Sequence, residues 1–476
     1  MNKKLLPYLI VIGFSIGTTP LSVAQNLPSI GDSSQTVFSS QDEEQVGKQV
    51  YQELLRRGVV TDDIAVNTYL NELGLKLSQG IPNNQNTFTL FGVNDNSINA
   101  FAMPGGYIGV HRGLLINAQS ESELASVLGH EMAHVTQRHL ARMQEGSTMN
   151  SLLALAGVLA GALAASQGNV DAAGGLIQAG VGAAIAKQLS YSRDYEREAD
   201  RIGMQYLANS GFDARAMPLF FSRLQSANRH NDNNSYAFLR THPVTTERIG
   251  ESQTLAQAYP VKLKADSTDF VLIREHLRVD ALGTDKAVRY YPDSLRAKQY
   301  LNEGAQHYGF AKALYLQNKL SEATQQLNLA EQQLGNQPLF LDLAAKIALK
   351  NKSPTQAQNI YTQALRTYPN NKLLVYGQIE TLLSLDKKIE ARSLIQKQLQ
   401  NNKNRPELYQ LLATTYGEEE PLYSYAALGD AYYYQGLYQG ALQQYEMALK
   451  ANQEDFYLRS QIEAKITLIK NQTFKK

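Results

Sequence analysis

The feature that most restricts the fold is a 34-residue period in the last third of the chain. Ala323, Ala357 and Ala391 follow this period, and each opens a helical pattern with an apolar or aromatic residue four positions later. This is the period of tetratricopeptide repeats, helix pairs that stack into a superhelix whose concave face binds segments of other proteins. The pattern predicts an all-α superhelix over residues 301–476. The alternative is a plain amphipathic bundle in which the alanine spacing arises by chance. Such a bundle would lack the pattern of apolar and aromatic residues that recurs within each repeat.

The number of repeats stays open. A fourth copy fits from Tyr425 to Ala448, and its corresponding alanine, Ala441, lies 50 residues after Ala391 instead of 34. We therefore expect about sixteen inserted or irregular residues around Glu418 to Pro421. The third copy also lacks the usual alanine after Ile395.

The length of the chain leaves room for a further domain, and its composition restricts the chemistry. The 476 residues suffice for two or three domains of roughly 100–200 residues each. Lys plus Arg number 45 against 44 Asp plus Glu, so the net charge of +1 creates no broad field for nucleic acid. The chain has no cysteine, which excludes thiolate metal sites, cysteine nucleophiles and disulfides. Any metal must be held by histidine and carboxylate side chains.

The first 24 residues have the pattern of a secretory signal peptide. A basic pair at residues 3–4 precedes an apolar run at residues 5–16, and residues 22–24 read Ser-Val-Ala, a small-residue cleavage site. We expect cleavage after Ala24 and export to the periplasm of a Gram-negative cell. A retained membrane anchor is the alternative, but roughly 20 apolar residues are needed to span a bilayer.

A second apolar stretch, residues 147–186, is rich in glycine and alanine. It could form a packed helical hairpin or a flap that touches the membrane. Because its glycines dilute the hydrophobicity and Asp171 interrupts it, we expect a buried or lid-like hairpin with at most peripheral membrane contact.

The residues between these two apolar stretches mix helical and β-type patterns. Two amphipathic helices are expected over residues 41–79. Short strands follow, with a Pro-Gly-Gly turn before the last, at residues 88–93, 99–103 and 107–110. Ser120 and Glu123 then form a capping box for a long helix that should run to about Met143. This half of the chain is predicted to be α+β.

The long helix carries the pattern His130-Glu131-Met132-Ala133-His134. Two histidines four residues apart lie on one helical face and can bind one Zn²⁺, while Glu131 points to the side, where it can take a proton from the attacking water. A surface helix with two ordinary histidines is the alternative, but the apolar residues of the same helix place one flank in a core. The pattern predicts one zinc ion per chain and a catalytic glutamate.

A catalytic zinc needs a third protein ligand and an open position. His139 lies five residues past His134, so on a continuous helix it points away, and we expect it at the surface. Glu196, on a later helix, is the remaining candidate. Asp200, one turn further, would then accept a hydrogen bond from the outer N–H of a ligating histidine. Glu198 faces elsewhere and is expected to be a solvated charge.

Four motifs, in this order along the chain, resemble one group of peptidases. They are Asn99 to Ile108, the zinc-binding pattern at 130–134, Glu196-x-x-Ala199-Asp200, and Thr241-His242-Pro243 with Arg248. Together they resemble the zinc peptidases related to the CAAX prenyl protease and the membrane-bound heat-shock peptidases. The resemblance implies a gluzincin, in which His130, His134 and Glu196 hold zinc and Glu131 activates water.

The same resemblance implies an architecture and a role. An α+β zincin-like metallopeptidase domain is expected at residues 25–265, with residues 266–300 as a linker or the start of the helical domain. The implied role is the removal of misassembled outer-membrane β-barrel proteins and chaperone-like help in their assembly, with the repeats binding these clients or the assembly machinery. A strand beside the cleft would pair with an extended, unfolded substrate; its residues are Asn99, Ala100, Phe101, Ala102 and Met103.

His242 and Arg248 are further candidates for catalytic roles. His242 precedes Pro243, whose ring favours an extended backbone before it, so the imidazole can project from a stiff loop. It could hydrogen-bond the developing oxyanion, or it could occupy the fourth metal position as a reversible block. We favour the block and assign oxyanion stabilisation to Arg248.

A non-catalytic adaptor or chaperone with a structural zinc site is the main alternative function. Glu131 argues against it, since a structural site needs no proton acceptor beside an open coordination position. A third hypothesis is a scaffold for the peptidoglycan or lipopolysaccharide pathways. Only the repeats and the signal peptide support it.

Overall fold

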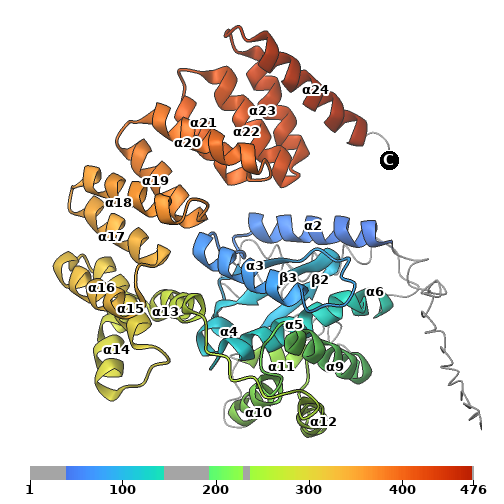
Figure 1. The fold of residues 1–476 in the computed structure, drawn as a ribbon. Coiled ribbons are helices and arrows are strands. Elements are labelled where there is room, and N and C mark those ends of the chain that lie inside the picture. Colours follow the sequence, from blue (N-terminus) through green and yellow to red (C-terminus); the bar gives the residue numbers. More distant parts are fainter. Residues whose placement is uncertain (1–38, 144–191, 229–235, 474–476) are drawn as a thin grey trace, which may run out of the picture.

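The structure, a computed structural model, describes residues 39–143, 192–228 and 236–473 (Figure 1). The N-terminal half is drawn in blue and green, and the C-terminal helices form an arc from yellow to red. The expected cleavage site after Ala24 and the Gly/Ala-rich residues 147–186 lie outside the described residues. Within the described ranges, no helix is both long and apolar enough to cross a membrane.

A small mixed sheet forms the centre of the N-terminal half. Its strands, in the spatial order β1-β3-β2, are β1 (Thr89–Val93), β2 (Ala100–Met103) and β3 (Tyr107–His111). β1 runs parallel to β3, and β2 runs antiparallel to it. Helix α2 (Ser40–Arg56) packs on one face of the sheet and α3 (Ile64–Ser78) on the other. β2 is therefore an edge strand among the described residues.

The Pro-Gly-Gly segment forms a 3₁₀ turn, η1 (Pro104–Gly106), between β2 and β3. Gly105 and Gly106 have φ angles of +71° and +81°, a backbone region that strains other residues. A Cβ on Gly106 would lie 2.0 Å from the carbonyl oxygen of Thr87, and one on Gly105 would lie 2.7 Å from Cα of Glu44. Glycine is therefore required for the turn to fit beneath α2.

The helices that follow the sheet carry most of the polar residues singled out above. Their bounds are α4 (Arg112–Asn117), α5 (Glu121–Thr136), α6 (His139–Met143), α9 (Arg193–Asn209), α10 (Ala216–Asn228), α11 (Phe238–Thr241) and α12 (Thr246–Ala256). The hydroxyl of Ser120 caps α5 as predicted, accepting a hydrogen bond from the N–H of Glu123. The prediction of one helix running to Met143 is wrong, because Arg138 has a φ of +52° and separates α5 from α6.

Helices α5 and α9 approach each other through two glycines. A Cβ on Gly203 of α9 would lie 2.8 Å from the backbone oxygen of Gly129 and from the backbone nitrogen of His130. A Cβ on Gly129 would lie 3.0 Å from the oxygen of Gly203. The missing side chains let the two backbones come into contact, so that residues projecting from both helices can meet.

The C-terminal half is helical throughout its described residues. Its helices are α13 (Thr268–Leu282), α14 (Thr284–Ala297), α15 (Glu303–Leu316), α16 (Leu320–Leu334), α17 (Pro338–Lys350), α18 (Pro354–Thr367), α19 (Lys372–Ser384), α20 (Lys388–Asn401), α21 (Pro406–Tyr416), α22 (Pro421–Gln435), α23 (Tyr438–Lys450) and α24 (Phe456–Thr473). The structure thus confirms the predicted fold class, an α+β domain followed by an all-α superhelix.

The corresponding alanines of the four repeat copies fill the contacts between repeat helices. All four are fully buried: Ala323, Ala357, Ala391 and Ala441. In the third copy, Gln398 stands where the others have a later alanine, and its buried Oε1 accepts a hydrogen bond from Arg405 at 3.2 Å. The extra residues before the fourth copy are inserted rather than irregular, because they include helix α21, which packs on α22.

One hydrophobic core joins the two halves of the chain. It extends from α3 and α5 through Phe270 on α13 to Tyr308 on α15 and Phe340 on α17. Further along, α19 packs on α3, and the side-chain amide of Gln52 on α2 donates to the carbonyl of Gln435 at the end of α22. The superhelix therefore curves around the N-terminal half (Figure 1).

Candidate metal centre

Four buried side chains converge between α5, α9 and the segment after α11. Each offers one ligand atom, and the four atoms lie within 4.8 Å of one another; the residues are His130, His134, Glu196 and His242. The Nε2 atoms of His130 and His134 are 3.0 Å apart, and Nδ1 of His242 lies 2.9 Å from Oε1 of Glu196. Helical spacing puts both α5 histidines on one face, and the glycine contact brings Glu196 of α9 opposite them.

The chemistry of this cluster fits a divalent metal. Two imidazoles and a carboxylate are the ligands of catalytic sites that keep a further position open. Glu131, next to His130, is fully buried. Burying a carboxylate is costly unless a donor or a positive charge lies nearby, and Oε1 of Glu131 lies 3.4 Å from Nε2 of His242. The residues therefore fit a metal site with a proton acceptor beside it.

The charges around the cluster set the protonation of its histidines. Burial alone would lower the pKa of His130, but its hydrogen bonds with Asp200 and Glu196 outweigh burial and raise that pKa to about 10. Burial holds the pKa of His134 well below its ordinary value. Burial also raises the pKa of Glu131.

Asp200 and Arg248 contact the residues of the cluster on the side away from its facing ligand atoms. Oδ1 of Asp200 lies 2.9 Å from Nδ1 of His130, the outer nitrogen of that ring. Arg248 directs its nitrogens to Asp200 at 2.8 Å, to Glu196 at 2.6 Å and to the carbonyl of Pro243 at 2.8 Å. Because its donors are engaged by these groups, the geometry favours a role in positioning carboxylates over the predicted oxyanion contact.

Comparison with known proteins identifies the family. The profile of peptidase family M48 matches residues 65–256, and that of a tetratricopeptide repeat matches residues 348–414. A putative beta-barrel assembly-enhancing protease of Vibrio cholerae is 33% identical over 404 residues, which cover 82% of this chain and 82% of the relative. The chain belongs to peptidase family M48. It is a metallopeptidase with C-terminal tetratricopeptide repeats.

Two more M48 relatives differ in how much of the chain they cover. The beta-barrel assembly-enhancing protease of Escherichia coli K12 is 30% identical over 86% of this chain and 85% of its own. The mitochondrial metalloendopeptidase OMA1 of Arabidopsis thaliana is 34% identical over 35% of this chain and 30% of its own. Among solved structures, yeast Tom70 aligns with 76% of this chain and 91% of its own, at 9% identity and a TM-score of 0.31.

Two residues near the M48 metal cluster lie elsewhere than the sequence predicted. His139 was expected at the surface, but it is fully buried, with Nδ1 2.8 Å from Nδ1 of His134. Its Nε2 lies 3.1 Å from Oε2 of Glu198. Glu198, expected as a solvated charge, is 28% exposed and also pairs with Arg142 at 3.1 Å. The break at Arg138 turns α6 back toward α5, which the spacing of residues alone could not indicate.

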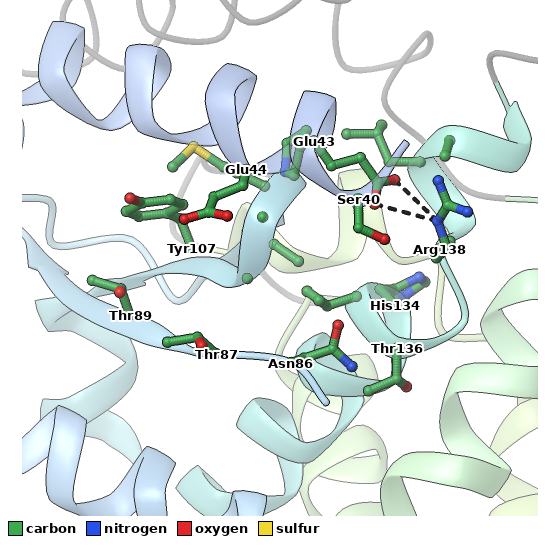
Figure 2. A pocket seen from close by; sticks show the side chains of 18 of the residues that line it. Ser40, Glu43, Glu44, Asn86, Thr87, Thr89, Tyr107, His134, Thr136 and Arg138 are labelled. Atoms are coloured by element: carbon green, nitrogen blue, oxygen red, sulfur yellow. Dashed lines mark hydrogen bonds and ion pairs between the residues drawn. The ribbon is translucent and has the colours of Figure 1, made fainter. Parts of the chain in front are cut away.

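A cavity of about 280 Å³ lies beside the metal cluster of this M48 domain. Figure 2 shows His134 at one end of it and Glu43 of α2 above, paired with Arg138 at 3.3 Å. Ala102 and Met103 line its wall, so the edge strand β2 borders the cavity. Of the residues predicted to bind substrate, Ala100 to Met103 form β2 and Asn99 immediately precedes it.

Proposed function

We propose that this M48 peptidase is a zinc-dependent endopeptidase exported to the periplasm of a Gram-negative cell. There it degrades misassembled outer-membrane β-barrel proteins and assists the assembly of others. The observation that carries the catalytic part is the buried group of His130, His134 and Glu196 with the buried carboxylate of Glu131 beside it. The names of the two relatives that cover more than 80% of this chain support β-barrel proteins as the clients. The pattern of the first 24 residues supports export to the periplasm.

The proposed chemistry assigns a separate task to each residue. His130, His134 and Glu196 would hold zinc, which supplies Lewis acidity that polarises a peptide carbonyl and acidifies water. Glu131 accepts the proton of the attacking water and passes it to the departing amine. Burial raises the pKa of Glu131 and thus makes it a stronger base. Asp200 keeps the proton of His130 on Nδ1, so that Nε2 faces the zinc.

The edge of β2 would bind the substrate as an additional strand. Its inner backbone groups pair with β3, and its outer groups have no strand partner among the described residues. Strand addition requires an extended segment with free backbone groups. Unfolded or stalled polypeptides present such segments, whereas folded neighbours do not. The tetratricopeptide superhelix would bind the same clients, or the assembly machinery, on its concave face.

A test of the mechanism compares two substitutions in the cluster. Glu131→Gln removes the proton acceptor and leaves all three ligands, so we expect one zinc per chain, an unchanged fold and cleavage of a denatured β-barrel precursor reduced at least about 10²-fold. Glu196→Ala should instead lose the metal. An adaptor with a structural zinc predicts no difference in cleavage between wild type and Glu131→Gln. Cleavage by that variant at the wild-type rate would show that the mechanism is wrong.

His242 is proposed to block the zinc at rest. Its Nδ1 lies 3.4 Å from Nε2 of His130 and 2.9 Å from Oε1 of Glu196, so the imidazole is within reach of the fourth metal position. Arriving substrate would displace it. We expect His242→Ala to keep zinc and to cleave a denatured model protein faster than wild type. A decrease by orders of magnitude at full zinc occupancy would favour the oxyanion role instead.

A further inference from the structure

A chain of hydrogen bonds leads from the metal cluster through His139 to the partly exposed carboxylate of Glu198. We propose that His139 and Glu198 hold the imidazole of His134 in the tautomer and orientation that bind zinc. We name this set of three residues the His134 relay. His139 and Glu198 act through His134 and are therefore positioning residues. The inference rests on the proposed zinc site and deepens it.

The break between α5 and α6 creates the His134 relay. On a continuous helix, a residue five positions after His134 would point about 140° away from it. Arg138 instead has a φ of +52°, and its guanidinium pairs with Glu43 of α2 at 3.3 Å. The chain therefore turns back at α6, and His139 is buried against His134 with their Nδ1 atoms 2.8 Å apart.

The distances assign a proton to each ring nitrogen of the relay. Nε2 of His134 faces the cluster, so its lone pair must be free for zinc and its proton must lie on Nδ1. Nδ1 of His139 lies 2.8 Å from Nδ1 of His134, so it accepts that proton. The proton of His139 therefore lies on Nε2, 3.1 Å from Oε2 of Glu198, a carboxylate that can only accept it.

Packing holds the relay in place. The ring of Tyr195 stacks on His139 at a centroid distance of 4.7 Å and an interplanar angle of 19°. The guanidinium of Arg142 lies over the ring of Tyr195 at 4.7 Å and pairs with Glu198 at 3.1 Å. Glu198 therefore receives two donors, one of them the imidazole that it orients.

Helix α9 supplies an acceptor for each of the two α5 histidines. Oδ1 of Asp200 lies directly against Nδ1 of His130, at 2.9 Å, whereas Glu198 acts on His134 through His139. Carboxylates that orient metal-binding histidines contribute strongly to metal affinity. The relay therefore fixes the tautomer and orientation of His134, as Asp200 fixes those of His130.

The experiment measures the zinc dissociation constant of the full chain by competition with a chromophoric chelator. The visible spectrum of the cobalt-substituted protein gives a second readout, of ligand geometry. The variants are His139→Ala, His139→Asn, His139→Gln and Glu198→Ala. The matched control is His111→Asn, which alters another buried histidine of the same domain, one that bonds Ser97 at 2.9 Å.

We expect His139→Ala to weaken zinc binding by about 10- to 100-fold and to shift the cobalt spectrum, because His134 loses its acceptor. The side-chain oxygen of asparagine lies close to the position of Nδ1, whereas that of glutamine lies near Nε2. His139→Asn should therefore bind zinc more tightly than His139→Gln, although glutamine is closer to histidine in volume. Glu198→Ala should weaken binding less than His139→Ala, and His111→Asn should leave it unchanged.

Two results would overturn the relay. One is wild-type zinc affinity in His139→Ala, and the other is tighter binding by His139→Gln than by His139→Asn, since packing alone would then explain the contact. If the His139 variants do not fold, Glu198→Ala remains a test, because Glu198 is 28% exposed and its truncation disturbs the core less. Unchanged zinc affinity in Glu198→Ala would overturn the relay. Failure of the wild-type chain to bind zinc would overturn the proposed function together with the relay.

Discussion

Arg248 neutralises the negative charge of two buried carboxylates at the metal cluster, Glu196 and Asp200. Glu196 and Asp200 are 1% and 5% exposed, and Arg248 contacts both. Burial alone would raise the pKa of Glu196, but the charge of His242 and the hydrogen bonds of three histidines hold that pKa well below its usual range. Glu196 therefore stays ionised at neutral pH, as a metal ligand must. Arg248 thus stabilises the proposed ligand Glu196 and also Asp200, the partner of the proposed ligand His130.

We predict that Arg248→Ala lowers the free energy of unfolding of the metal-free chain by about 3–5 kcal/mol, because two buried carboxylates lose their partner. Arg248→Lys should retain part of this stability, since it keeps the charge but not the paired geometry. Urea unfolding measures both. Arg197→Ala, which breaks exposed pairs with Glu247 and Glu251, is the control and should cost at most about 1 kcal/mol. Equal losses in Arg248→Ala and Arg197→Ala would contradict the assignment.

At the scale of elements, two helices determine the geometry of the metal cluster. α5 supplies His130 and His134, and α9 supplies Glu196, so the distance between the helix backbones sets the size of the cluster. Gly129 and Gly203 set that distance, because a Cβ on either would meet the backbone of the other helix. The positions of the proposed ligands thus depend on two glycines that are not ligands themselves.

We predict that Gly203→Ala moves α5 and α9 apart, weakens zinc binding and lowers the free energy of unfolding by about 1–3 kcal/mol. The matched control is Gly250→Ala on α12, where a Cβ would meet nothing within 4 Å. That substitution should raise stability by up to about 1 kcal/mol, because alanine favours the helix. Zinc titration and urea unfolding of both variants give the comparison. Equal stability of the two variants would contradict a close helix contact.

Sequence patterns predicted elements and site residues to different degrees. Helical spacing placed His130 and His134 on one face, and the same spacing placed Asp200 one turn from Glu196. The position of His139 could not be predicted, because it depends on one left-handed residue, Arg138, whose conformation is stabilised by contacts with distant Glu43. The β-branched residues just before the break, Val135 and Thr136, are only a weak signal of a helix end.

For the molecule as a whole, a polar network fastens the superhelix to the M48 domain. Asp63 caps α3 and accepts from Nε2 of His276 on α13 at 2.8 Å. Nδ1 of His276 lies 2.7 Å from the hydroxyl of Tyr308 on α15. Lys312, also on α15, donates to the carbonyl of His276 at 2.9 Å. Three helices from both halves of the chain are thus held together around one imidazole.

We predict that Asp63→Asn lowers the free energy of unfolding by about 1.5–3 kcal/mol at pH 7, since it removes a charged hydrogen bond but keeps a good helix cap. Burial alone would raise the pKa of Asp63, but the contacts with His276 hold it well below its usual range. Its stabilisation is therefore present above the unfolded pKa of about 3.9 and is lost as pH falls further. The difference between wild type and variant should persist at pH 5 and shrink below pH 4.

Urea unfolding at several pH values measures this difference. The matched control is Asp62→Asn, because Asp62 is the exposed neighbour of Asp63. Its effect should stay within about 0.5 kcal/mol at every pH. A difference between wild type and Asp63→Asn that grows on acidification would contradict the proposed role of the network.

The continuous core also affects when during synthesis the N-terminal half can complete its packing. The core that contains Val66 on α3 also contains Ile347 on α17, and α5 packs within it. Residues leave the ribosome in chain order, so this core cannot close until the first repeats have emerged. A chain that ends before α17 therefore lacks part of the packing around the helices that carry the proposed metal ligands. We expect such an unfinished chain to hold these ligands less rigidly than the complete one.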